Sequence, residues 1–199
     1  MRRTMLLSFL ALAAGRALAD DPAVARVGEE APNFTLTDLD GKQHELASYV
    51  AAGKIVVLEW FNADCPFVKK HHARNKTMKD LAARHADQVV WLAINSSCEG
   101  AQGWGAERNR KAAEEYGIVY PILLDTDGTV GRLYQARNTP HMYVIDTKGI
   151  LVYAGAIDDD PGRELGGVNY VAAALEAVEA GRPVETAETR PYGCAVKYQ

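Results

Sequence analysis

Cys65 is the side chain best placed to do chemistry in this sequence. It follows the apolar run 55–60 (IVVLEW) closely and precedes a basic, helix-prone stretch. A helix N-terminus carries unpaired backbone N–H groups and about half a positive charge, which stabilise a thiolate more than a thiol. Lys69 and Lys70 add positive potential one turn later, whereas Asp64 opposes it. The pattern predicts an exposed, reactive thiol, and an inert buried cysteine is the alternative.

Two further cysteines, Cys98 and Cys194, bring the total in the chain to three. Three cysteines are too few for a disulfide scaffold, and in an oxidising compartment an odd number leaves at least one thiol unpaired in the monomer. Val68 stands three residues after Cys65, so Cys65 cannot close a disulfide within its own helical turn. A redox cycle at Cys65 therefore needs Cys98, Cys194 or another molecule.

The elements that position Cys65 alternate between buried strands and helices. Apolar and turn patterns predict hairpins at 34–46 and 142–155, strands at 54–61, 88–95 and 120–124, and helices at 66–85, 105–116 and 168–180. A turn that begins at 125–128 is expected to lead into a short helix that runs through Tyr134. Strand–helix–strand repeats imply parallel strands covered by helices on both faces, and the last hairpin requires an antiparallel edge. We therefore expect an α/β fold of three layers, with a mixed β-sheet and an N-terminal β-hairpin extension.

The first 19 residues have the pattern of a secretory signal peptide. Arg2 and Arg3 precede an apolar stretch at 5–14, and an Ala-Leu-Ala cleavage site ends at Ala19. The apolar stretch is shorter than the ~20 residues that span a bilayer. We divide the chain into a signal peptide (1–19), a domain (20–184) and a C-terminal tail (185–199) that carries Cys194. The mature protein is expected to be periplasmic or secreted, without stable membrane insertion.

Charge and histidine content bear on possible ligands. The formal net charge is −4, and loss of the signal-peptide arginines would make it more negative. An acidic chain without a basic patch argues against nucleic acid as a partner. A thiolate with imidazole suits copper or zinc, and His71, His72, His85 and His141 are the candidate nitrogen ligands. His71 and His72 lie almost two helical turns from Cys65, so we assign no metal site and no cofactor.

Four motifs resemble the redoxin branch of the thioredoxin-like superfamily, which includes alkyl hydroperoxide reductase/thiol-specific antioxidant proteins and exported thiol–disulfide reductases. The motifs are G-x-x-A-P-x-F at 28–34, WFNADCP at 60–66, D-x-D-G at 125–128 and TPHMYVID at 139–146. The resemblance spans about residues 26–180. More narrowly, the chain resembles a peroxiredoxin-like group whose single cysteine occupies the first position of C-x-x-C. It implies a thioredoxin-like fold with a cis-proline, Pro140, that faces Cys65.

The sequence departs from the peroxiredoxin pattern P-x-x-x-T-x-x-C. Leu58 and Asn62 occupy the proline and threonine positions, and Thr139-Pro140 replaces the arginine that precedes the late strand. Arg137 is the nearby residue that could substitute. A hydroxyl and a guanidinium bind and polarise the O–O bond in peroxiredoxins, so fast peroxide reduction is not expected here.

The resemblance implies an exported thiol-based oxidoreductase, or antioxidant, with Cys65 as the nucleophile. The backbone at Thr139 and Pro140 would orient a disulfide or peroxide, and an unidentified thiol would supply electrons. Protein thiols, disulfides or hydroperoxides are the expected partners. The functional alternative is a non-catalytic binding protein of the same fold, which holds copper or docks a partner's thiol.

Turnover at a lone nucleophilic cysteine requires a second thiol to resolve the intermediate. Cys194 lies in a G-C-x-x-K-Y tail similar to tails of this group, which favours it over Cys98. A Cys98–Cys194 disulfide that pins the tail and leaves Cys65 free is the structural alternative.

Overall fold

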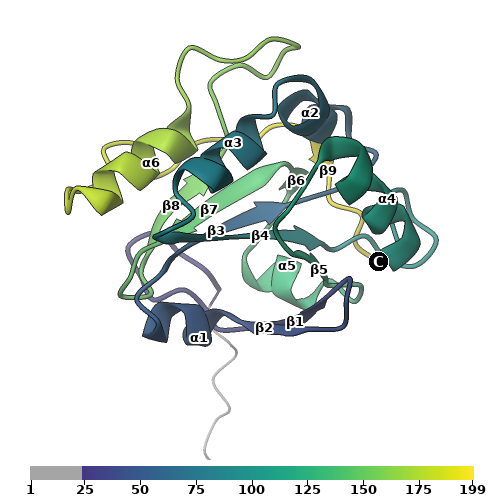
Figure 1. Cartoon of the computed structure of the whole chain (residues 1–199), viewed down its shortest axis with the longest axis horizontal. Coiled ribbons are helices and arrows are strands. Elements are labelled where there is room, and N and C mark those ends of the chain that lie inside the picture. Colours follow the sequence, from purple (N-terminus) through teal and green to yellow (C-terminus); the bar gives the residue numbers. More distant parts are fainter. Residues whose placement is uncertain (1–23) are drawn as a thin grey trace, which may run out of the picture.

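A computed structural model describes residues 24–199 of the chain (Figure 1). The expected signal peptide, residues 1–19, lies outside the described residues. In the part that is described, no helix combines the length and the apolar character needed to cross a membrane.

A seven-stranded mixed sheet forms the centre of the molecule, in the order β2-β1-β5-β4-β3-β7-β8. Its strands are β1 (Thr35–Asp38), β2 (Gln43–Glu45), β3 (Ile55–Trp60), β4 (Val89–Asn95), β5 (Ile122–Leu124), β7 (His141–Ile145) and β8 (Leu151–Gly155). β3, β4 and β5 are parallel, and the β1/β2 and β7/β8 hairpins form antiparallel edges. Every residue of β3 is buried, as its continuous apolar run predicts. The expected mixed α/β fold is confirmed.

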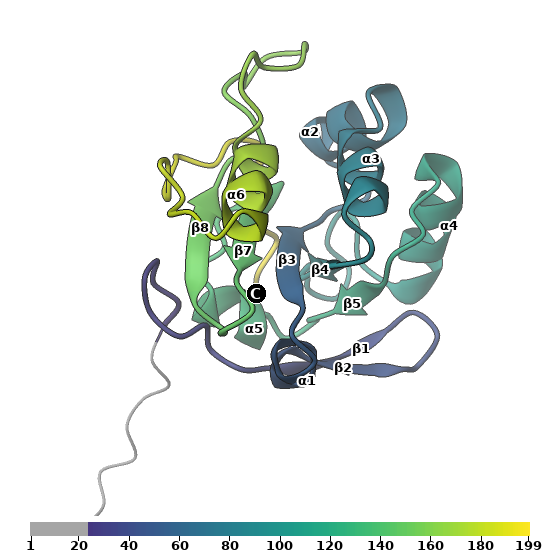
Figure 2. The same ribbon diagram turned by 60° about the vertical axis from the view of Figure 1, so that its left-hand side comes forward.

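Helices cover both faces of this sheet, as Figure 2 shows. They are α1 (Leu46–Ala51), α2 (Pro66–Lys69), α3 (Thr77–Arg84), α4 (Ala106–Tyr116), α5 (Thr129–Leu133) and α6 (Tyr170–Glu179). One apolar cluster joins α3 and α6 to the sheet through Leu81 and Leu175, and another joins α1 and α5 through Leu46 and Val130. The two clusters explain the three layers, because each buries one face of the central strands.

The single helix expected at 66–85 is wrong, because the segment is broken in the middle. A π-helical turn, Lys70–Arg74, follows α2, and Lys76 adopts the left-handed conformation (φ 55°) before α3 begins. Lys70, His71 and His72 are all buried. One face of a regular helix cannot bury three consecutive side chains, whereas the wider turn directs them to three different partners.

The tail contains an element that no periodicity predicts. Strand β9 (Cys194–Ala195) pairs antiparallel with β6 (Asn138–Thr139) in a separate two-stranded sheet. Figure 1 shows this pair beside the N-terminal end of α2. The C-terminal tail of the chain therefore returns to the segment that precedes Pro140.

Candidate active site around Cys65

The structure brings together Cys65 and the Thr139-Pro140 segment. Cys65 follows the end of β3 and is the residue immediately before α2, with extended backbone (φ −71°, ψ 125°). Its thiol donates a hydrogen bond to the backbone carbonyl of Thr139, with Sγ and O 2.9 Å apart. The Thr139-Pro140 peptide bond is cis. Strands β3 and β7 are antiparallel neighbours, so the start of β7 meets the end of β3.

Cys194 joins the same group of residues through the tail. It is the partner of Thr139 in the β6/β9 pair, and the Thr139 hydroxyl donates to its carbonyl oxygen at 3.5 Å. Burial and the neighbouring Cys65 thiol together raise the pKa of Cys194 to about 11. Residues 24–199 contain no disulfide, so all three cysteines are free.

Cys98 takes a different place along the tail. Its backbone N–H donates to the carbonyl of Lys197 at 2.8 Å, three residues beyond Cys194. Its side chain is partly exposed, and it does not belong to the apolar cluster that holds Cys65 and Cys194. Of the two candidate resolving cysteines, Cys194 is therefore the one that lies in the apolar cluster of Cys65.

The expectation of an exposed thiol at Cys65 is wrong. Cys65 is 0% exposed and packs in a cluster with Ala63, Val68 and the partly buried Phe67 and Cys194. The tail accounts for part of this cover, because Gly193 and Cys194 lie over the Thr139 carbonyl that accepts the thiol hydrogen bond. A substrate cannot reach the sulfur in this conformation.

Charges around Cys65 differ from those that the sequence predicts. Lys70 turns away, and its ammonium donates to the Asp160 carbonyl at 2.6 Å and lies 3.7 Å from Asp158. Asp64, which would oppose a thiolate, is paired with Arg108 through contacts of 2.7 and 3.0 Å. The pairing raises the pKa of the Arg108 guanidinium and offsets the negative charge beside Cys65. A stabilising role for Lys69 remains a prediction.

Comparison with known proteins places this architecture in a family. The family model described as AhpC/TSA matches residues 27–154, which is more than half of the chain. The chain belongs to the AhpC/TSA family. Thiol-disulfide oxidoreductase ResA of Geobacillus kaustophilus is 33% identical over 153 residues, 74% of this chain and 81% of the relative. Thiol:disulfide interchange protein DsbE of Escherichia coli K12 is 29% identical, over 78% of this chain and 84% of its own length.

Solved structures agree with the family assignment. A hypothetical protein from Sinorhizobium meliloti superimposes with a TM-score of 0.79 at 28% identity, over 87% of this chain and 95% of its own. An uncharacterised conserved protein from Geobacillus kaustophilus gives 0.77 at 32% identity, over 87% and 93%. The thioredoxin-like fold that the motifs implied is thus confirmed for this AhpC/TSA chain.

Glu59 is a buried acid that none of the sequence motifs singled out. It sits in β3, six residues before Cys65, and is 0% exposed. Its carboxylate accepts from His72 Nε2 at 2.6 Å and, through the other oxygen, from Trp91 and Tyr120 at 3.0 Å each. Burial alone favours the protonated form, but His72 and these donors outweigh it and lower the pKa of Glu59. The sequence signal that could have identified Glu59 is a single carboxylate inside the otherwise apolar run 55–60.

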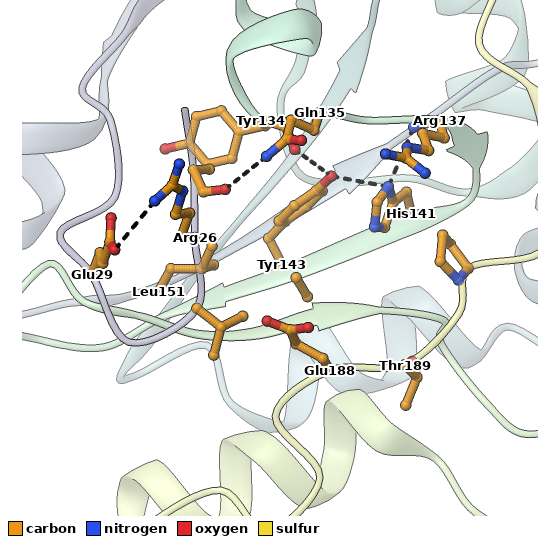
Figure 3. A pocket seen from close by; sticks show the side chains of 14 residues that line it. Arg26, Glu29, Tyr134, Gln135, Arg137, His141, Tyr143, Leu151, Glu188 and Thr189 are labelled. Carbon is orange, nitrogen blue, oxygen red and sulfur yellow. Dashed lines mark hydrogen bonds and ion pairs between the residues drawn. The ribbon is translucent and has the colours of Figure 1, made fainter. Parts of the chain in front are cut away.

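His141 follows the cis-proline and lines a pocket of about 470 Å³ that Figure 3 shows. Its Nδ1 atom is hydrogen-bonded to the Tyr143 hydroxyl at 2.9 Å, and Arg137 lines the same pocket. Burial and the Arg137 charge lower the pKa of His141 to about 3. None of the three cysteines lines this pocket, so His141 and Arg137 face a different space from the Cys65 thiol.

The other histidines are engaged within the fold. His71 Nε2 lies 2.8 Å from the Tyr192 hydroxyl, and burial is the main cause that lowers the pKa of His71 to about 4. His85 pairs with Glu179 at 2.7 Å. Among residues 24–199, no three histidine, cysteine or acidic side chains are grouped as a metal site would require.

Proposed function

We propose that this chain is an exported thiol–disulfide oxidoreductase in which Cys65 is the nucleophile and Cys194 the resolving thiol. The observation that carries the proposal is the meeting of both cysteines at Thr139, beside the cis-proline. Relatives named ResA and DsbE, which are thiol–disulfide oxidoreductases, share the fold and support the reaction class.

The proposed cycle has two exchange steps. In the first, the Cys65 thiolate attacks one sulfur of a substrate disulfide, a bond forms between the two sulfurs, and the other substrate sulfur leaves as a thiolate. In the second, the deprotonated Cys194 attacks Cys65 Sγ, which releases the second substrate thiol and leaves a Cys65–Cys194 disulfide. The substrate gains two electrons, the enzyme loses two, and an external dithiol then reduces the enzyme disulfide.

The raised pKa of Cys194 fits the order of these steps. In the reduced chain, burial and the adjacent Cys65 keep Cys194 protonated at neutral pH. Cys194 is then a poor nucleophile, because the thiolate is the attacking species. Once Cys65 is bonded to a substrate sulfur, its contribution to the raised pKa disappears, and Cys194 becomes easier to ionise. Cys194 therefore becomes an effective nucleophile only after the mixed disulfide at Cys65 has formed.

Peroxide is the weaker substrate in this proposal. Leu58 and Asn62 leave the site without the hydroxyl of the peroxiredoxin motif, and Arg137 lines the pocket of Figure 3 rather than the Cys65 site. Any attack of Cys65 on a hydroperoxide would release an alcohol and form a sulfenic acid, which Cys194 would convert to the same disulfide with loss of water. We expect this route to be slow.

The proposed cellular location rests on residues 1–19. Their charged start, apolar stretch and Ala-Leu-Ala site support export to the periplasm or beyond, with 20–184 as the redoxin domain and 185–199 as the tail that carries Cys194. Protein thiols and disulfides are the proposed partners, because such compartments contain proteins with disulfides.

Replacing Cys194 with serine tests the proposed division of labour. In Cys194→Ser the first exchange proceeds but the second cannot, so a substrate mixed disulfide at Cys65 accumulates, whereas the natural chain passes on to an internal disulfide. Non-reducing peptide mass spectrometry after one equivalent of a disulfide substrate measures both species. Cys98→Ser is the matched control and should behave as the natural chain. Turnover of Cys194→Ser at the natural rate would refute the assignment.

A further inference from the structure

The thiol at Cys65 is covered by the tail of its own chain. A Cβ atom at Gly193 would overlap the Thr139 carbonyl oxygen and contact Phe67, so the tail backbone lies directly on the residues that surround Cys65. Gly193 also has a φ of +116°, which other residues rarely adopt. Contact this close leaves no room for a second polypeptide at β6 while the tail is in place.

The tail is seated as an added β-strand. Asn138 pairs with Ala195 and Thr139 with Cys194 in antiparallel register, and the Val196 N–H donates to the Arg137 carbonyl at 3.0 Å. Pairing through the main chain accepts many sequences, because backbone groups make the contacts. An extended segment of another protein, with a cysteine opposite Thr139, would use the same donors and acceptors.

Two tyrosines fasten the tail on either side of β9. The Tyr192 hydroxyl is hydrogen-bonded to Asp158 and to His71. The Tyr198 hydroxyl donates to the Ala136 carbonyl at 2.8 Å, and the Arg132 guanidinium lies 5.0 Å from the centre of its ring. Besides these contacts, the tail is attached by a two-residue strand, by the backbone bond from Cys98 to Lys197, and by Tyr192, Cys194 and Val196, which pack against the apolar clusters. All three of these side chains are only partly buried, so the segment can open without global unfolding.

Space for a longer chain lies next to the tail. A pocket of about 620 Å³ is lined by residues that include Asn138 of β6, Asp158, and Tyr192 and Gly193 of the tail. A substrate segment that replaced β9 could continue into this space, since the pocket borders β6 itself. Residues that flank the substrate cysteine would then contact a surface that the closed tail partly fills.

We propose that the tail is a tethered substrate mimic, which must leave β6 before an extended, cysteine-containing segment of a substrate protein can pair there and reach Cys65. This inference rests on the proposed role of Cys65 as the nucleophile. The tail then has two functions: it closes the site in the reduced, idle enzyme, and it returns with Cys194 to resolve the mixed disulfide. A small disulfide needs only a minor opening of the tail, whereas a polypeptide can reach Cys65 only after it has displaced the tail from β6.

Tyr198→Phe and Gly193→Ala test this proposal in the full mature chain. The first removes the hydroxyl bond to Ala136, and the second introduces a Cβ that the closed tail cannot accommodate. Both are combined with Cys194→Ser and Cys98→Ser, so that Cys65 is the remaining thiol and the first exchange is observed alone. Amide hydrogen exchange at Val196, whose N–H is bonded in the closed tail, reports the opening independently.

The probes are an unstructured peptide whose cysteine carries 2-nitro-5-thiobenzoate, and 5,5′-dithiobis(2-nitrobenzoate) as the small disulfide. In each case Cys65 forms a bond to one sulfur and a coloured thiolate leaves, so one absorbance follows both rates. Loss of one neutral hydrogen bond is expected to raise the open fraction, and with it the peptide rate, about fivefold. The small-disulfide rate should change less than twofold. Tyr49→Phe, which removes a hydroxyl bond to His44 far from the tail, should leave both rates unchanged.

The outcomes separate the two proposals. A selective rise of the peptide rate in both tail variants supports the tethered mimic. Equal rises for both probes, or an unchanged or slower peptide rate despite faster exchange at Val196, overturn it while Cys65 remains the nucleophile. If neither probe modifies Cys65 in any variant, the proposed function fails as well.

Discussion

Replacing Cys65 with serine is expected to lower the rate of thiol–disulfide exchange by at least about 10³-fold, because an alcohol cannot replace a thiolate as the attacking and bond-forming group. The structure gives this residue no substitute at the site. Cys194 is the adjacent thiol, and its pKa of about 11 leaves it protonated at neutral pH. The measurement is steady-state reduction of a disulfide substrate with an external dithiol as the electron source.

Two further variants make this result specific. Cys98→Ser removes a thiol of the same chain that lies outside the Cys65 cluster, and it should retain nearly the full rate. Cys65→Ala removes the sulfur without leaving a hydroxyl and should match Cys65→Ser. The assignment of Cys65 would be wrong if Cys65→Ser kept the natural rate, or if Cys98→Ser lost activity to the same extent.

Replacing Glu59 with glutamine is expected to lower the free energy of unfolding by about 3 kcal/mol or more, as happens when one partner of a buried ion pair is lost. A glutamine oxygen can still accept from Trp91 and Tyr120, but its NH₂ group then faces His72 Nε2. His72 Nε2 then faces a donor instead of the carboxylate, and the other ring nitrogen, Nδ1, is already buried without a hydrogen-bond partner in the natural chain. The variant therefore loses the bond between the Glu59 carboxylate and His72 Nε2 and adds a buried donor without an acceptor.

Chemical denaturation measures this loss, and Glu179→Gln is the matched control. Glu179 also pairs with a histidine, His85, at 2.7 Å, but its side chain is 21% exposed. This pair is only partly buried and lies near solvent, so the control should lose about 1 kcal/mol, the upper end for surface pairs. Similar losses in the two variants would contradict a structural ion pair at Glu59. The lowered pKa of Glu59 means that its stabilisation is present at neutral pH and is lost as the pH falls below the usual carboxyl range.

The central sheet was predictable because its signals are local. The run IVVLEW is continuous and apolar, and β3 is buried on both faces at the centre of the sheet. Alternation with helices then predicts a parallel neighbour for this strand, which is β4. The order of the elements, together with the redoxin motifs, was therefore enough to predict that Pro140 lies near Cys65.

The parts that were not predicted depend on partners distant in sequence. The sequence of Lys70–Arg74 has the pattern of an ordinary helix. Its π-helical turn lets Lys70, His71 and His72 contact Asp158, Tyr192 and Glu59, which are distant in sequence. Strand β9 has two residues and no repeat, so periodicity cannot reveal it. The burial of Cys65 comes partly from Gly193 and Cys194, at the opposite end of the chain.

Disulfide mapping of the oxidised chain shows directly whether Cys65 and Cys194 form the redox pair. The reduced mature protein is treated with one equivalent of diamide, free thiols are alkylated, and non-reduced peptides are identified by mass spectrometry. We expect a peptide in which Cys65 is linked to Cys194, with Cys98 alkylated. A Cys98–Cys194 disulfide with Cys65 alkylated, or a Cys65–Cys98 disulfide, would contradict it.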